Sequence, residues 1–158
     1  MVLVCEHSED GALGLVLNRA GELIVGDAAP ELCELAGDDA LIGVGGPVQP
    51  DALLVLAEFD DVSQAGICVV ENVGLVGDGS EIDDLVESTR RVRIFAGYAG
   101  WGPGQLDAEL EREDWFVAPA GVDDIFNPDA DELWGRVLAR KGGHFALVAR
   151  MPIDPSVN

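Results

Sequence analysis

The sequence predicts an α+β fold in a single compact domain. Its 158 residues fall within the roughly 100–200 residues of one domain, and no repeat or long linker divides them. Hydrophobic residues make up 48% of the chain, which is enough to build a core. Short runs rich in Val, Ile and Leu are interspersed with segments of helical spacing, so strands and helices are both expected.

The first half of the chain is predicted to consist mostly of strands. Val2–Glu6 and Ala12–Leu17 form a predicted hairpin, because the Asp-Gly pair between them favours a tight turn. A helix is predicted over Val25–Ala36, where apolar residues recur at helical spacing and a glycine follows. Val, Ile and Leu content predicts further strands at Ala40–Val44, Leu53–Phe59, Ile67–Val70 and Val73–Val76.

The second half combines strands with better-defined helices. Ser80 and Asp83 have the spacing of a capping box, which predicts a helix over Glu81–Thr89. A strand over Val92–Tyr98 leads into a glycine-rich turn, after which Pro103 can begin a helix. The remaining predictions are that helix over Gln105–Arg112, a strand over Trp115–Ala118, a helix that starts at Asp129-x-x-Glu132 and stops at Gly142, and a strand or helix over His144–Arg150.

The charge of the chain argues against several classes of partner. The net charge is -21, and Arg19 is the only Lys or Arg before Arg90. Nucleic-acid and anionic-lipid surfaces both select basic patches, so neither direct DNA or RNA binding nor membrane binding is expected. No apolar run approaches the roughly 18–20 residues of a membrane helix, and no basic leader precedes an apolar stretch. We therefore expect a cytoplasmic protein.

Residues with catalytic or metal-binding chemistry are few. Cys5, Cys33 and Cys68 are an odd number without CxxC spacing, which argues against a disulfide scaffold or a four-cysteine zinc site. Cys5 and His7 would share a face of a strand, but no second pair of ligands accompanies them. His144 has no paired motif, and no GxSxG, HExxH or SxxK pattern occurs. No catalytic residue, metal or cofactor is predicted.

Three segments are candidate binding elements. Phe95–Leu106 passes from a strand through four glycines to a helix start, an arrangement that suits either an anion cradle or a tight turn packed under aromatic rings. Gly43–Val48 ends a strand, and its Gly and Pro are typical of a simple turn. Arg19, alone among acidic residues, suits either a structural ion pair or a ligand contact.

Four segments together carry a family resemblance: CEHSEDGALGLVLNR, GVGGPVQPD, RIFAGYAGWGPGQLDAELEREDW and ARMPIDPSVN. Over nearly its whole length the sequence resembles the AlgH/YqgE family. The resemblance implies a compact α+β fold with a coiled, mixed or antiparallel sheet and helices around it. Members of that family are commonly described as transcriptional regulators, without an established biochemical activity. The matching positions are Asn18, Arg19, Gly45, Gly46, Pro47, Val48, Gly97, Tyr98, Gly100, Trp101, Gly104, Gln105, Leu106 and Glu109.

Two departures from the family pattern affect these expectations. Ala20 stands where the family usually has proline, which loosens the turn after Arg19. The chain also begins inside what resembles a family strand, so we expect either a shortened chain that lacks a usual N-terminal strand or a misplaced start. If that strand is missing, the open edge on Val2–Glu6 favours self-association, or an upstream segment, once restored, stabilises the protein.

Two hypotheses of function follow. The first is a binding or regulatory module that affects transcription indirectly, through a protein partner or a small anion. The alternative is an enzyme that acts on a small anionic metabolite at the Gly97–Gln105 turn. Under either hypothesis, we expect Arg19 and the Tyr98–Gln105 turn to come together in one ligand-binding site. The candidate ligand-binding residues are Asn18, Arg19, Gly45, Gly46, Pro47, Gly97, Tyr98, Gly100, Trp101, Gly104, Gln105 and Glu109.

Overall fold

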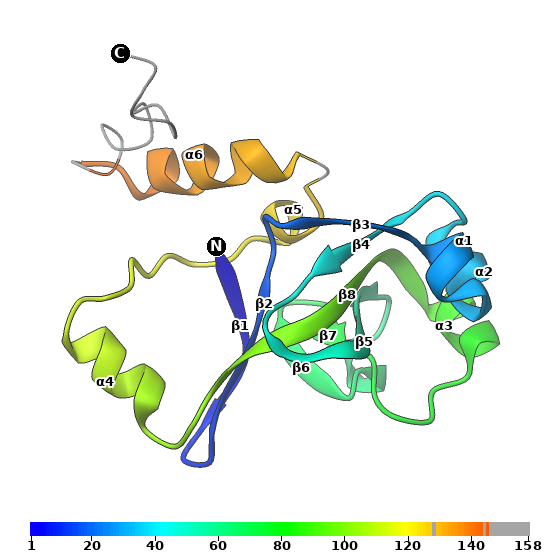
Figure 1. Cartoon of the computed structure of the whole chain (residues 1–158), viewed down its shortest axis with the longest axis horizontal. Helices are drawn as coiled ribbons and strands as arrows, with labels where there is room; N and C mark the ends of the chain where they lie inside the picture. The colour runs from blue at the N-terminus through cyan, green and yellow to red at the C-terminus, as the bar shows by residue number, and fades with distance from the viewer. Residues whose placement is uncertain (128, 144, 146–158) are drawn as a thin grey trace.

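An eight-stranded sheet organises the chain in this computed structural model, which describes residues 1–127, 129–143 and 145 (Figure 1). Its main path runs β1-β2-β8-β5-β7-β6, while β4 pairs with both β3 and β8. The strands are β1 (Val2–Ser8), β2 (Gly11–Val16), β3 (Ala20–Ile24), β4 (Leu41–Val44), β5 (Val48–Phe59), β6 (Ile67–Val70), β7 (Val73–Leu75) and β8 (Thr89–Trp101).

The sheet is nearly all antiparallel and curls toward closure. Only β4 and β8 pair in parallel, with Gly43 opposite Phe95 and Val44 opposite Ala96. The terminal strands β1 and β6 approach within 8 Å between Cα atoms, although no ladder joins them among the described residues. The prediction of an α+β fold with a mixed, coiled sheet is confirmed.

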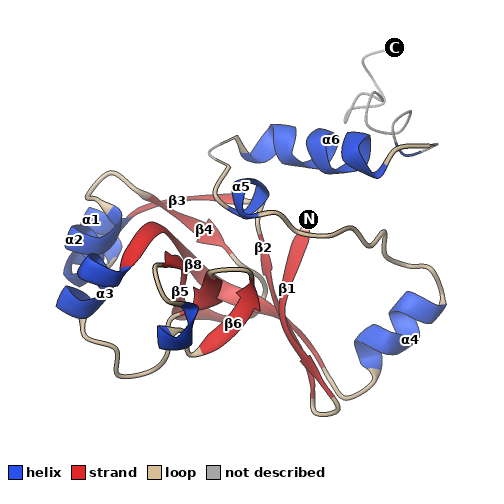
Figure 2. Cartoon of the chain, turned by 180° about the vertical axis from the view of Figure 1, so that it is seen from behind, coloured by secondary structure: helices blue, strands red, loops and turns tan. Residues whose placement is uncertain are grey.

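The helices gather at the two ends of the sheet (Figure 2). One group covers the end of β3 and β5. In the other group, two helices lie near the N-terminus of the chain and the third lies beside the β1–β2 hairpin. The first group is α1 (Val25–Ala28), α2 (Cys33–Ala36) and α3 (Ile82–Ser88); the second is α4 (Gln105–Glu111), α5 (Val122–Ile125) and α6 (Ala130–Lys141). None of the described helices is long and apolar enough to cross a membrane.

The main core lies between the sheet and the helices α5 and α6. Leu15, Leu56 and Phe95 are fully buried there, and Ile125 of α5 and Leu133 of α6 close it. Burying a large apolar side chain contributes about 1.5–3 kcal/mol, so these residues account for much of the driving force for folding. A second cluster around Val25 and Ile42 holds the first group of helices in place.

The predicted helix over Val25–Ala36 is wrong in its continuity. The segment forms α1, then a 3-10 turn over Pro30–Leu32, then α2. Pro30 lacks an N–H and its ring collides with the preceding helical turn, so the helix must break before it. Ala29 at the break has an extended φ of -148°.

Two other local predictions are corrected. Ser80 does not cap α3: Glu81 stands at its N-cap position, and the Ser80 hydroxyl donates to the Gly77 carbonyl at 3.0 Å. The predicted strand over Trp115–Ala118 is a loop, because the Trp115 indole is bonded back to α4 and Pro119 follows.

The chain also has elements that the sequence patterns did not reveal. The strand β3 and the short helix α5 were not predicted, and β8 continues to Trp101 through Gly100 and through Gly97, which has a positive φ of 67°. The glycine-rich turn is therefore confined to the residues around Pro103. The start of α6 was predicted correctly, since Asp129 accepts a hydrogen bond from the Glu132 N–H at 3.1 Å. The prediction for His144–Arg150 lies, except for Phe145, outside the described residues.

Candidate functional site

The two glycine motifs lie against one another, backbone on backbone. A Cβ on Gly45 would lie 2.1 Å from the Gly97 carbonyl oxygen, and one on Gly46 would lie 2.2 Å from the Tyr98 carbonyl carbon. The Gly45 carbonyl also accepts from the Val16 N–H at 2.8 Å, so it bridges β2 and β8. Close packing of three strands therefore explains why these positions are glycine, and it leaves no room there for a ligand.

The turn before α4 is closed by its own hydrogen bonds. Gly104 is the N-cap residue with a left-handed φ of 68°, which glycine adopts at little cost. The Gln105 side-chain oxygen accepts from the Gly102 N–H at 3.1 Å, and the Gln105 N–H donates to the Gly102 carbonyl at 3.0 Å. Two donors of the possible anion cradle at Gly97–Gln105, the Gly102 and Gln105 N–H groups, are thus already in use, and α4 has only seven residues.

Glu109 links three segments of the chain through one carboxylate. It accepts from the indole N–H of Trp101 at 3.0 Å, from that of Trp115 at 2.8 Å and from the Gln105 amide at 2.9 Å. These bonds, that of Trp115 foremost, lower the pKa of Glu109. The Trp101 and Trp115 rings meet edge to face, with centroids 6.0 Å apart. Three of the candidate residues, Trp101, Gln105 and Glu109, thus build a structural clamp together with Trp115, which we call the Glu109 clamp.

Asn18 and Arg19 lie in the turn between β2 and β3. The Asn18 side-chain oxygen accepts a hydrogen bond from the Met1 ammonium group. The pKa of that ammonium group is lowered mainly by its burial and to a smaller extent by the positive charge of Arg19. The Arg19 carbonyl accepts from the Val44 N–H at 3.0 Å. Within the described residues Arg19 forms no ion pair, and Glu109 is bonded elsewhere. A shared site of Arg19 with Tyr98–Gln105 stays a prediction.

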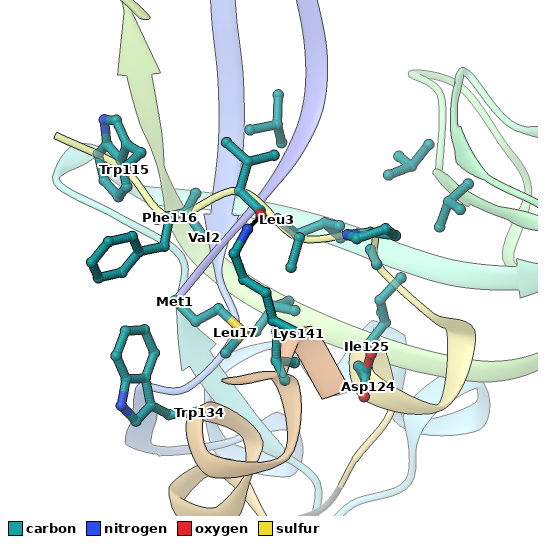
Figure 3. A pocket seen from close by; sticks show the side chains of 18 of the residues that line it. Met1, Val2, Leu3, Leu17, Trp115, Phe116, Asp124, Ile125, Trp134 and Lys141 are labelled. Atoms are coloured by element: carbon teal, nitrogen blue, oxygen red, sulfur yellow. Dashed lines mark hydrogen bonds between the residues drawn. The ribbon is translucent and has the colours of Figure 1, made fainter. Parts of the chain in front are cut away.

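A cavity of about 460 Å³ lies beside the N-terminal half of β1 (Figure 3). Its other walls are the loop after α4, the inner face of α6 and the end of β6. All three tryptophans of the chain, Trp101, Trp115 and Trp134, line it. Its apolar lining is completed by Met1, Val2, Leu3, Val4, Leu17, Val69, Val70, Leu106, Leu110, Phe116, Val117, Ala118, Pro119, Ala120, Ile125, Val137 and Leu138.

The polar side chains of the cavity are His7, Asp124 and Lys141. His7 pairs with Asp107 at 3.2 Å at one margin. Asp124 is 5% exposed and accepts from Arg140 at 2.7 Å, which raises the pKa of Arg140.

Lys141 donates to the Val117 carbonyl at 2.5 Å and lies over the Phe145 ring. The polar groups of this cavity are thus engaged within the protein, and its free surface is mainly apolar.

The described residues offer little for chemistry. Burial raises the pKa of Cys5 to about 12, so its thiol is a weak nucleophile. A bulge between Val4 and Glu6 breaks the strand alternation, so Cys5 is buried while His7 is exposed, and the two do not share a face. No group of three or more potential metal ligands occurs in the described part of the chain.

The cavity was not predicted from the sequence. Of its lining residues only Trp101 was among the candidates; Trp115 and Trp134 were assigned to a strand and to the apolar stripe of a helix. The available signal was that all three tryptophans fall within residues 101–134. Tryptophans that come together in space often mark binding surfaces, because they combine a large apolar area with a polar N–H.

The fold and the cavity define a class: a small α+β protein with a nearly closed sheet and an aromatic-lined apolar cavity at the sheet margin. The AlgH-like family model matches residues 1–146, and the chain belongs to this family. It is similar to a UPF0301 protein of Thermobifida fusca, with 40% identity over 166 residues, covering 99% of this chain and 84% of the relative. It is also similar to a UPF0301 protein of Rhodococcus jostii, with 41% identity over 166 residues, covering 100% of this chain and 81% of the relative.

Two solved structures share the fold. A crystal structure of a Corynebacterium diphtheriae protein matches with a TM-score of 0.85 at 27% identity, covering 95% of this chain and 81% of that one. The solution structure of AlgH from Pseudomonas aeruginosa matches with a TM-score of 0.71 at 28% identity, covering 97% of this chain and 84% of the AlgH chain. The family resemblance seen in the sequence is confirmed.

Proposed function

We propose that this protein is a non-catalytic binding module whose ligand occupies the apolar cavity beside β1. One observation carries the proposal: the cavity gathers all three tryptophans of the chain around about 460 Å³. That volume lies within the roughly 300–1,000 Å³ typical of ligand pockets, which are likewise mostly apolar with a few polar groups. Binding without chemistry is compatible with an indirect effect on transcription from the cytoplasm, through a protein or small molecule.

The enzyme alternative gains no support from the geometry. In the Gly97–Gln105 segment, Gly97 packs against the backbone of Gly46 and Val48, and Gly104 adopts the left-handed conformation before α4. The nearby acid, Glu109, has a lowered pKa because it accepts hydrogen bonds, which makes it a weaker base. The groups that the sequence singled out at this turn therefore hold the fold together around the cavity.

A neutral fluorescent probe tests whether the cavity binds ligands. We expect N-phenyl-1-naphthylamine to brighten on binding and to quench tryptophan emission, because all three indoles lie at the cavity. Ala118→Phe places a ring in the cavity and should weaken binding at least about tenfold, or 1.4 kcal/mol.

Ala28→Phe is the matched control, since Ala28 is exposed on α1 away from the cavity lining. Equal affinity in both variants, or no binding by the wild-type protein, would contradict the proposal.

A further inference from the structure

We infer that the ligand of the cavity is an amphipathic monocarboxylate, whose apolar body lies among the tryptophans and whose carboxylate pairs with Lys141 at the rim. The inference rests on the proposed function, because it names the class of ligand for the same cavity. Its support comes from three observations: the position of Lys141, the partners of its ammonium group, and the pairing of the other charged groups in the lining.

Lys141 places a positive charge at the rim of an apolar cavity. It lies in the last turn of α6, is exposed to solvent and also lines the cavity. Its side chain reaches from α6 to the loop after α4, where the ammonium group meets the Val117 carbonyl (Figure 3). Both walls at this point belong to the last third of the chain. An anionic head group bound here would remain in contact with water while the rest of the ligand is buried.

The Lys141 ammonium group has no acidic partner within the described residues. It donates one hydrogen bond to the Val117 carbonyl and lies 4.8 Å from the centre of the Phe145 ring. Both partners are formally neutral, and an ammonium group carries three donors. Two donors therefore remain for a ligand, although the protein has 30 acidic residues that could have supplied a partner.

The other charged side chains of the described lining are already paired. Asp124 accepts from Arg140 at 2.7 Å. His7 is paired with Asp107 at 3.2 Å. Lys141 is thus the one charged side chain in this part of the lining without an opposite charge beside it. A ligand carboxylate would supply that charge through a charge-assisted hydrogen bond, whereas a cationic ligand would be repelled.

A purely structural role for Lys141 is the competing explanation. Its bond to Val117 would then serve only to hold α6 against the loop. Arg140, however, already connects the same turn of α6 to the Pro119 carbonyl at 2.9 Å and to Asp124. The charge of Lys141 is therefore not needed for this attachment, which favours a role in binding.

The lining determines the body of the ligand. Trp101, Trp115 and Trp134 offer aromatic surface, and most of the remaining lining is aliphatic. Aromatic and aliphatic bodies both gain from burial on such a surface, so the test compares the two. The net charge of -21 repels anions at long range, but at 0.15 M salt this repulsion is screened beyond about 8 Å. Binding is therefore measured at this ionic strength.

Two probes with the same rings test the role of Lys141. The probe 1-anilinonaphthalene-8-sulfonate carries an anionic group that N-phenyl-1-naphthylamine lacks. Lys141→Met keeps an unbranched side chain and removes the charge. We expect it to weaken binding of the anionic probe at least about fivefold and to change that of the neutral probe by less than about twofold. Lys141→Arg keeps the charge and should retain most of the anionic binding.

Carboxylates are then compared with neutral analogues of the same shape. We expect 2-naphthoate or decanoate to displace the neutral probe, and Lys141→Met to weaken that acid relative to 2-naphthylmethanol or decanol. Displacement by only one of the two acids would assign an aromatic or an aliphatic body. Displacement by neither acid would overturn the inference.

Arg136→Met is the matched control, because Arg136 is an exposed cation on the same helix that does not line the cavity. It should change the binding of neither probe. An equal loss of both probes in Lys141→Met would make Lys141 a structural residue, and an unchanged affinity for the anionic probe would also show that the inference is wrong. Equal losses of the anionic probe in Lys141→Met and Arg136→Met would reduce the effect to net charge and contradict it too.

These outcomes separate the inference from the proposed function. If the neutral probe binds but charge at Lys141 makes no difference to the anionic ligands, the binding module stands and only the class of ligand is wrong. If the neutral probe does not bind the wild-type protein, both fall.

Discussion

The Glu109 carboxylate accepts a hydrogen bond from the Trp115 indole at 2.8 Å, and this contact fastens the loop after α4 to the helix that precedes it. The same carboxylate holds Trp101 at the end of β8. Since Trp101 and Trp115 both line the cavity, the position of one wall depends on a single acidic side chain.

We predict that Glu109→Ala loosens this wall while the core stays folded. Trp115 loses its partner and becomes more exposed, so tryptophan emission should shift to the red and probe affinity should fall. Far-ultraviolet circular dichroism should be unchanged. Glu111→Ala, an exposed acid on the same helix, is the control. An unchanged emission spectrum in Glu109→Ala would show that the clamp does not position the loop.

The clamp also predicts a pH dependence. The pKa of Glu109 is lowered in the folded protein, so its stabilising contribution is fully present above the unfolded value of about 4.3. That contribution is lost as the pH falls through the lower folded pKa. We expect the thermal stability of the wild-type protein to fall more than that of Glu109→Gln below about pH 4.3. Parallel stability curves for the two proteins in this range would contradict the assignment.

The contact between the two glycine motifs predicts a large effect from one methyl group. Gly45→Ala would place Cβ 2.1 Å from the Gly97 carbonyl oxygen, and overpacking of this kind costs about 1–3 kcal/mol. Gly102→Ala meets nothing closer than 3.9 Å and should change stability by less than about 0.5 kcal/mol. Urea denaturation of both variants measures the difference, and equal midpoints would show that the strands can separate freely.

Cysteine reactivity should follow burial. With its pKa raised to about 12, Cys5 has a thiolate fraction of roughly 10⁻⁴ at pH 8. Cys68 is exposed. Iodoacetamide should therefore label Cys68 in the folded protein and reach Cys5 only after denaturation in urea. Peptide mass spectrometry gives the order, and early labelling of Cys5 would mean that β1 opens readily.

The charge predicts that duplex DNA is not a direct partner. A fluorescence anisotropy titration at ~150 mM salt should show no binding tighter than the ~10⁻⁴–10⁻⁶ M range of non-specific association. Submicromolar affinity that weakens steeply with salt would overturn both this expectation and the indirect role in transcription.

Local sequence by itself determined much of this protein. Apolar alternation and the Asp-Gly turn predicted the hairpin of β1 and β2, and Asp129 marked the start of α6, because these signals act between residues close in the chain. The acidity and the family resemblance were equally visible. Pro30 is also a local signal, and its effect on the preceding helical turn outweighs the helical spacing of the apolar residues.

Only the tertiary structure decided what the glycines and tryptophans do. Gly45 is glycine because Gly97, more than fifty residues away, lies against it, and no local pattern records such a contact. The cavity likewise brings Val4 of β1 together with Trp115 and Trp134 from the last third of the chain. A site built from distant segments depends on how the sheet curls and where the helices pack, and these are fixed by long-range burial of the core.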